Sequence, residues 1–141
     1  MSDTVVQVHP VTGGDWTNLG QAGDAVSAAG NVVAFTTPES EQGNTDLNGD
    51  GDTVDRVLQV YSADTAALTN VAQTAEDFVV GEQALVAFRT REARQGNQVL
   101  NDDGDTLDDV LQVYDAVSLL GSSAAERGTV GSIASRSFHI S

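Results

Sequence analysis

The chain has 141 residues, with 21 Asp and Glu against six Arg, no Lys and no Cys. Its net charge of −15 argues against nucleic acid or an anionic membrane as partner, because both attract positive protein surfaces. The lack of Cys excludes disulfides and thiolate metal sites. No apolar run reaches membrane-spanning length and the start MSDTVVQVHP does not resemble a signal peptide, so we expect one soluble domain, residues 1–141.

The acidic residues are concentrated in two segments. Residues 38–56 and 91–109 together hold twelve of the 21 acids. A protein that needs only a solvated acidic surface would spread these charges over the chain. Their clustering favours the binding of a cation, because like charges held close together repel one another.

The two acidic segments belong to a 53-residue repeat. Between residues 46–63 and 99–116, thirteen of eighteen positions are identical, and both segments contain VLQVY. Weaker copies occupy the two ends: VVQVH at 5–9 resembles VLQVY, and residues 130–141 resemble 23–35 with one inserted residue. Self-similarity at such a period is typical of repeat architectures, including β-propellers.

Each repeat is predicted to form four short strands. Runs such as VLQVY and ALVAF are rich in β-branched and aromatic residues, and turn sequences such as AAGN and VGEQ interrupt them. No stretch has sustained helical periodicity. We therefore expect an all-β fold of four-stranded antiparallel sheets, the blades of a β-propeller. The expected full blades are 25–73, with strands 25–29, 32–37, 57–62 and 67–73, and 77–125, with strands 77–81, 84–90, 110–116 and one near 118–125.

The two ends of the chain then read as halves of one further blade. Residues 4–22 match the last two strands of a blade and residues 131–141 the first two, so the chain encodes three blade equivalents in permuted order. Three blades are fewer than the roughly four to eight of closed propellers, and an open arc exposes sheet edges. We expect a homodimer in which each chain completes its partner's split blade, giving a six-bladed ring. A fragment of a longer propeller would contain the same number and order of blade strands, so this alternative stays open.

The segment DLNGDGDTVD, residues 46–55, has the composition of a calcium loop. Ca²⁺ takes roughly six to eight oxygen ligands from carboxylates, amides, backbone carbonyls and water. Side chains at positions 1, 3 and 5 would point inward, and Gly51 would allow the turn that presents the next carbonyl. The alternative is a solvated turn, because Asp, Asn and Gly suit turns without any ion. The predicted ligands of this first loop are Asp46, Asn48, Asp50, the carbonyl of Asp52, and Asp55.

The second loop departs from this pattern at its first position, where Val99 replaces Asp46. We therefore expect weaker or water-completed calcium binding there. Glu39 and Glu92 recur in register just before the two loops, and they could be ligands or could cover an edge strand. The predicted ligands of the second loop are Asn101, Asp103, the carbonyl of Asp105, and Asp108.

DLNGDGDTVD resembles the D-x-[DN]-x-[DN]-G calcium loops of dockerins, thrombospondin type 3 repeats and the FG-GAP blades of integrin-type propellers. The longer segment SEQGNTDLNGDGDTVDRVLQVYSA is similar to a repeat of large bacterial β-propeller proteins. The resemblance covers roughly residues 32–116, and it implies calcium-stabilised blades without supplying catalytic residues. An EF-hand fits less well, because Val57 stands where that loop needs a bidentate Glu and strands flank it instead of helices.

The sequence shows no catalytic constellation. His9 aligns with Tyr61 and His139 with Leu85, so both are expected at packing positions, and Trp16 lies in a connection between strands. The expected first strands of the blades carry no carboxylate pair, triad or metal-ligand cluster.

These observations predict a non-enzymatic calcium-binding propeller that serves as a scaffold or binding module. Its partner would be a second copy, with an unidentified protein or carbohydrate as a possible further ligand. An extracellular or cell-surface location fits, because millimolar external calcium would saturate even a weak site. The alternatives are a hydrolase or lyase on a propeller frame, with a calcium-assisted or dimer-interface active site, and a self-assembling fragment without an activity of its own.

Overall fold

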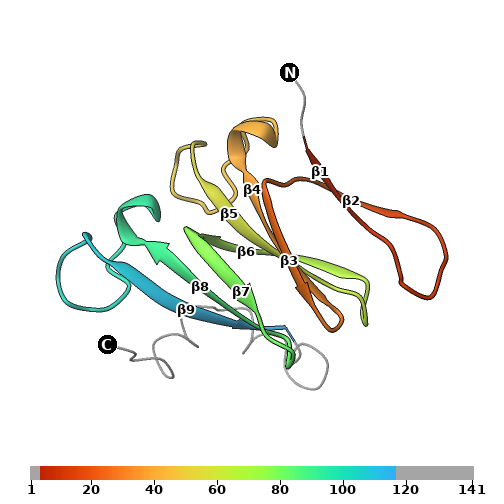
Figure 1. The fold of residues 1–141 in the computed structure, drawn as a ribbon. Helices are drawn as coiled ribbons and strands as arrows, with labels where there is room; N and C mark the ends of the chain where they lie inside the picture. The colour runs from red at the N-terminus through yellow and green to blue at the C-terminus, as the bar shows by residue number, and fades with distance from the viewer. Residues whose placement is uncertain (1–3, 117–141) are drawn as a thin grey trace.

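The computed structural model describes residues 4–116, which form short strands and two single-turn 3₁₀ helices (Figure 1). All of the strands pair in antiparallel fashion. The elements are β1 (Val5–Val8), β2 (Thr17–Ala22), β3 (Ala25–Ala29), β4 (Val32–Pro38), η1 (Glu39–Glu41), β5 (Arg56–Ser62), β6 (Ala67–Thr74), β7 (Asp77–Val80), β8 (Leu85–Arg91), η2 (Glu92–Arg94) and β9 (Asp109–Asp115).

The strands build three small sheets that follow one another along the chain. The first sheet holds β1 and β2, the central sheet β3 to β6 in sequential order, and the third sheet β7 to β9. Figure 1 shows the central sheet between the other two, with both acidic loops at the same end of their sheets. The predicted all-β class and antiparallel sheets are confirmed, and within residues 4–116 the sheets do not close into a ring.

The strand positions agree with the sequence prediction to within one or two residues at each end. The repeat also recurs in the pairing, because Val32 lies opposite Ser62 in the central sheet as Leu85 lies opposite Asp115 in the third. The predicted strand near 118–125 and the predicted half-blade 131–141 lie outside the described residues. The 3₁₀ turns η1 and η2 were not predicted, and they occupy the start of each acidic loop.

The central sheet lies between the other two sheets, so side chains on both of its faces are buried. In β4 nearly every residue is buried, whereas in β8, its equivalent in the third sheet, buried residues alternate with more exposed ones. A strand that is covered on both faces reads as continuously apolar, and one that is covered on one face alternates. Phe35 of β4 is fully buried and lies close to Gly23, at the end of the first sheet.

The main hydrophobic core lies between the central and third sheets. Phe88, Leu58 and Val86 are its largest fully buried apolar side chains, and Phe78 and Val80 pack against it from β7. Its buried members are Val32, Ala34, Leu58, Val60, Val71, Ala75, Ala84, Val86, Phe88, Tyr114 and Ala116.

A buried glutamine joins the third sheet to the central one. Gln95, which directly follows η2, is 1% exposed. Its side-chain oxygen accepts the N–H of Thr74 at 2.8 Å, and its amide nitrogen donates to the carbonyl of Ala72 at 3.1 Å. Both partners lie on β6, so the side chain fastens one sheet to the last strand of the sheet before it.

The same contact recurs one repeat earlier. Gln42, equivalent to Gln95, accepts the N–H of Ala22 at 2.7 Å and donates to the carbonyl of Gly20 at 3.1 Å, both on β2. We call Gln42 and Gln95 the glutamine clasps. Because the clasps are equivalent, β2 contacts the central sheet in the same way as β6 contacts the third sheet.

The prediction that His9 occupies a packing position is wrong. Its expected packing position matches that of Tyr61, which is buried, but His9 lies beyond the end of β1 and is exposed. Its ring contacts that of Trp16, with centroids 4.7 Å apart. The reason is that β1, within the described residues, has no neighbouring strand on its second edge.

Replacing Gln95 with Leu is expected to destabilise the fold by about 1–3 kcal/mol, because the buried N–H of Thr74 loses its side-chain acceptor. Urea unfolding followed by circular dichroism measures the change. Gln98→Leu is the matched control, because Gln98 is exposed three residues further on and should cost little. Equal stabilities of the two variants would contradict the role of the clasp.

Candidate metal centres

Each acidic loop connects two neighbouring strands of one sheet. The first runs from η1, after β4, to the start of β5, and the second runs from η2, after β8, to the start of β9. The pairing of Pro38 with Arg56, and of Arg91 with Asp109, brings the two ends of each loop together. Each loop therefore starts and ends at a pair of hydrogen-bonded strands.

A buried glutamate holds the base of the first loop. Glu39 is fully buried, and its Oε1 accepts the N–H of Leu47 at 2.5 Å and, more weakly, that of Asn48 at 3.4 Å. Its Oε2 accepts the N–H of Asp55 at 3.1 Å. One carboxylate thus binds backbone from both the beginning and the end of the loop sequence.

Glu92 does the same for the second loop. It is fully buried, and it accepts the N–H groups of Leu100, Asn101 and Asp108, which are the 53-residue equivalents of the Glu39 partners. The sequence left open whether these glutamates are ligands or cover an edge. Their recurrence in register was the available signal, and the structure places both at the centre of the loops.

Carboxylates converge at equivalent positions of the two loops. In each group, one oxygen from every member lies within 4.8 Å of those of the others. The first group contains Glu39, Asp52 and Asp55, and the second contains Glu92, Asp103, Asp105 and Asp108. Of the predicted ligands, the structure therefore brings together five acids, joined by the two glutamates that the prediction left open. Asp52 and Asp105, predicted to bind through their carbonyls, enter these groups through their side chains.

Asp46, the predicted ligand at position 1, organises the first loop instead of joining its carboxylate group. Its Oδ1 accepts the N–H of Gly49 at 2.6 Å and that of Asp50 at 3.2 Å, and its Oδ2 accepts the N–H of Gly51 at 2.8 Å. The replacement of Asp46 by Val99 in the second loop therefore removes a cap on backbone amides. It does not remove a member of the convergent group.

The predicted asparagine ligands lie against the closing aspartates. The amide nitrogen of Asn48 is 3.5 Å from Oδ2 of Asp55, and that of Asn101 donates to Oδ2 of Asp108 at 2.9 Å. In both loops an amide N–H thus occupies part of the space that faces the acids. Rotation of the amide would turn its oxygen toward that space.

Successive side chains brace both loops in the same way. The Oδ1 of Asp50 accepts the N–H of Asp52 at 3.0 Å, and the Oδ1 of Asp103 accepts that of Asp105 at 3.1 Å. This hydrogen bond to the residue two positions on is the Asx-turn for which Asp and Asn are suited. The loop conformation is therefore encoded locally, and it recurs despite five differences in eighteen residues.

Burial and like charge act on Asp55. It is 3% exposed. Burial, then a hydrogen bond with the Asp50 carboxyl, and then the charges of Asp52, Asp50 and Glu39 raise its pKa to about 7. In the second loop the pKa of Asp108 is raised, chiefly by its hydrogen bond to Asp103. The pKa of Asp103 is lowered, chiefly by the backbone N–H of Asp105.

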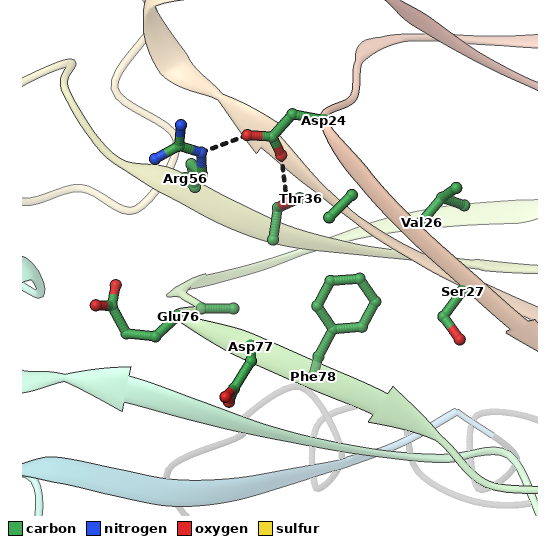
Figure 2. A pocket seen from close by; sticks show the side chains of 10 residues that line it. Asp24, Val26, Ser27, Thr36, Arg56, Glu76, Asp77 and Phe78 are labelled. Carbon is green, nitrogen blue, oxygen red and sulfur yellow. Dashed lines mark hydrogen bonds and ion pairs between the residues drawn. The ribbon is translucent and has the colours of Figure 1, made fainter.

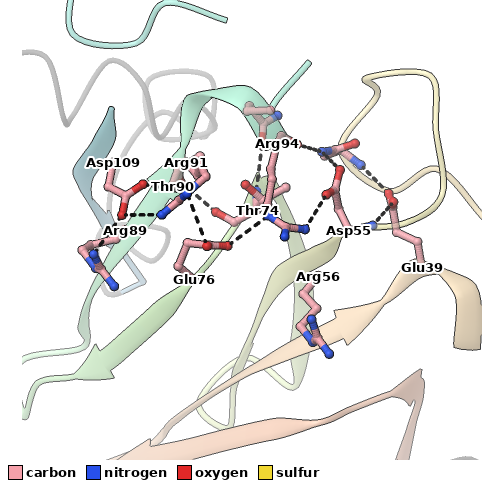
Figure 3. Close-up of polar contacts among 12 residues, drawn as sticks. Glu39, Asp55, Arg56, Thr74, Glu76, Arg89, Thr90, Arg91, Arg94 and Asp109 are labelled. Atoms are coloured by element: carbon pink, nitrogen blue, oxygen red, sulfur yellow. Dashed lines mark hydrogen bonds and ion pairs between the residues drawn. The ribbon is translucent and has the colours of Figure 1, made fainter. Parts of the chain in front are cut away.

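The first loop is also the surface on which the third sheet rests. Arg94 of η2 places a guanidinium nitrogen 3.7 Å from Oδ1 of Asp55, and its carbonyl accepts from Asn48 at 3.4 Å. Gly96 lies so close that a Cβ there would be 2.9 Å from the Cβ of Asp50, and its φ of +64° also favours glycine. Figure 3 shows Arg94 between Asp55 and Glu76, which belong to the central sheet and to the link into the third sheet.

A pocket of about 460 Å³ opens between β3 and β7 and gathers acids outside the loops (Figure 2). Asp24 there is paired with Arg56 and accepts from Thr36. Its repeat equivalent, Asp77, is paired with Arg89, which lowers the pKa of Asp77. Both aspartates are thus engaged in ion pairs with arginines, so the pocket offers no specific support for a hydrolase or lyase.

The comparisons with known proteins give no match to any family model, curated protein or solved structure. The resemblance to bacterial calcium-binding propeller repeats therefore stays a prediction from the loop sequence. None of the helices in residues 4–116 is long and apolar enough to span a membrane.

The raised pKa of Asp55 predicts a pH dependence of the ion-free protein. A carboxyl with a folded-state pKa near 7, above its ordinary 3.8, contributes stability that is fully present below pH 4 and is lost as the pH rises through 7. Urea unfolding in EDTA should therefore show a loss of stability between pH 4 and 7 that becomes smaller in Asp55→Asn. Identical pH profiles for parent and variant would contradict this assignment.

Proposed function

We propose that the protein is a calcium-binding repeat protein whose sheets are blades of a β-propeller and whose ions fix the acidic loops. It would serve as a non-enzymatic scaffold or binding module. The observation that carries the proposal is the recurrence of one carboxylate group in two loops, with Glu39, Asp52 and Asp55 matched by Glu92, Asp105 and Asp108.

The close approach of these acids supports a cation. Three or four carboxylate oxygens within 4.8 Å repel one another unless a proton or a positive ion lies among them. Burial, a hydrogen bond with Asp50 and the charges of the neighbouring acids raise the pKa of Asp55 to about 7, so protonation relieves part of this repulsion when no ion is bound. The nearest positive group of the protein is the Arg94 guanidinium, 3.7 Å away. A divalent ion would supply the missing charge at neutral pH.

The donor set supports calcium among the divalent ions. All of the convergent atoms are carboxylate oxygens, and the nearest additional donors are asparagine amides and backbone carbonyls. Hard oxygen ligands suit Ca²⁺ and Mg²⁺, whereas zinc prefers Cys and His. A flexible loop with several acids favours Ca²⁺, which accepts irregular coordination, over the strict octahedron of Mg²⁺.

The position of the first loop supports a structural role for its ion. The loop contacts η2 through Asn48 and Asp55, and Asp50 lies against Gly96 just after η2. The loop is also tied to β6 by Asn70, which donates to the carbonyl of Leu47 at 2.8 Å. An ion that fixes the loop would thereby fix the surface on which the third sheet packs. Saturation at a hundredfold excess over Kd would add about 2.7 kcal/mol of stability.

The location and the further partners follow from the proposed affinity and remain part of the proposal. A loop site with water-completed coordination would be filled by millimolar calcium outside the cell, which favours an extracellular or surface location. A protein or carbohydrate could then bind to the surface of the assembled sheets.

Calcium titration of EDTA-treated, desalted protein tests the proposal. Isothermal titration calorimetry should give calcium binding, and the melting temperature should rise by several degrees in millimolar calcium. Asp52→Asn should weaken the first site and Asp105→Asn the second, at least tenfold. Asn keeps the loop turn in both, because the side-chain oxygen that accepts the N–H of Val54 or Leu107 is retained.

Asp102→Asn is the matched control for these variants. Asp102 is an exposed acid of the second loop that lies outside the convergent group, so its loss should leave both sites nearly unchanged. Failure of calcium to bind or to raise the melting temperature would refute the proposed function. An equal weakening by Asp102→Asn and Asp105→Asn would show general attraction of cations to an acidic surface.

A further inference from the structure

The strand β1 has the sequence of a buried strand, but it is exposed. VVQVH at 5–9 aligns with VLQVY at 57–61 of β5. Val57 is fully buried whereas Val5 is 49% exposed, and Gln59 is buried whereas Gln7 is exposed. The difference therefore lies in what surrounds the strand.

What β1 lacks is one neighbouring strand. In the central sheet β5 pairs with β4 on one side and β6 on the other, but β1 pairs only with β2 among the described residues. The clasp of Gln42 on β2 and the contact of Gln59 with Gln21 recur as Gln95 on β6 and Gln112 with Gln73. The pair β1–β2 is thus equivalent to β5–β6, the last two strands of the four-stranded central sheet.

The other end of the described array also has an open surface. Val32 and Leu58 of the central sheet are 4% and 0% exposed because the third sheet covers them. Their equivalents in the third sheet are Leu85, which is 38% exposed, and Leu111, which is half-buried. A further sheet stacked in the same manner would cover both.

Residues 130–141 have the sequence of the missing strands. They resemble residues 23–35, which include β3 and the start of β4, the two strands that precede β5 in the central sheet. They contain Arg136 and no acid, in a chain of net charge −15. This segment can therefore approach the acidic body of another copy with less repulsion than other parts of the chain.

We propose that a second copy of this chain docks its residues 130–141 on the free edge of β1, and that two reciprocal contacts close a ring of six sheets. The proposal rests on the propeller arrangement proposed above. A second copy is required because three sheets are fewer than the roughly four to eight that close a propeller, whereas two chains supply six. The contact is the same on both chains, as two-fold symmetry requires, and it leaves no sheet edge for further growth.

Light scattering after size exclusion, in calcium at physiological salt, tests the assembly. The expected mass is twice the 14.6 kDa of one chain. Val5→Asp should shift the mass to that of one chain, because it places a charge where Val57 is fully buried in the complete sheet. Val11→Asp is the matched control: Val11 is an exposed valine in the β1–β2 turn, and its replacement should leave the dimer intact.

Cross-linking identifies the segments in contact. The chain has no cysteine, so Val8→Cys and Ile140→Cys can be made in separately tagged copies, mixed and treated with a short bis-maleimide. A covalent product that contains both tags supports the proposal. A monomer, a larger polymer, a dimer that survives Val5→Asp, or a dimer without this cross-link would overturn it.

The calcium measurements on the same samples keep the two proposals separate. Val5→Asp leaves all members of both carboxylate groups in place, so its calcium titration should match that of the parent. A monomer that still binds calcium would refute the ring alone. A stable dimer that does not bind calcium would refute the proposed function alone.

Discussion

The structure depends on one constraint, which is that a buried carboxylate must have partners for both of its oxygens. Glu39 and Glu92 are fully buried, and each meets this requirement with backbone N–H groups from the two ends of its acidic loop. The constraint has two consequences. It closes the loop at its base, and it places a further carboxyl group beside Asp55 or Asp108. The need for a counter-charge therefore follows from the fold itself and not only from the number of acids in the loop.

The loop in turn determines how neighbouring sheets meet. The first loop contacts Arg94 of η2 through Asn48 and Gly96 after η2 through Asp50, and the clasp Gln95 binds to β6. Two small contacts, one on a loop and one on a strand, thus set the position of the third sheet, and the hydrophobic core fills the space between them. Because the clasp at Gln42 is the same, the stacking rule belongs to the repeat and not to one pair of sheets.

Much of the fold was predictable because strand sequences and turns are local signals. The runs VLQVY and ALVAF and the turn at Gly30 are enough to place β3 to β9 within one or two residues. The roles of the site residues were less predictable. Asp46 is a predicted ligand by its spacing, and in the structure it caps backbone amides. The sequence left open whether the two glutamates are ligands or cover an edge strand, and in the structure they hold the loops. Spacing reports which residues can point inward, and it does not report which backbone groups compete for them.

The contacts between neighbouring sheets could not be predicted from the sequence, because they join residues that have no fixed separation along the chain. All four arginines of residues 4–116 lie in ion pairs, but only one of these four pairs, Arg94 with Asp55, joins the third sheet to the central one. The other three are Arg56 with Asp24, Arg89 with Asp77, and Arg91 with Asp109. Exposed pairs of this kind add little stability, so the contact between the sheets depends mainly on the buried core and on Gln95.

Arg94 makes the two loops electrostatically different. In the first loop its guanidinium already lies 3.7 Å from Asp55, so an entering cation must share that carboxylate or displace the arginine. No ion pair between an arginine and the convergent acids of the second loop occurs within the described residues. The second loop also brings four acids together against three in the first, even though Val99 replaces its first aspartate. The affinity of each site is therefore set by what packs on the loop as much as by the loop sequence, which is why two near-copies of one motif need not bind an ion equally.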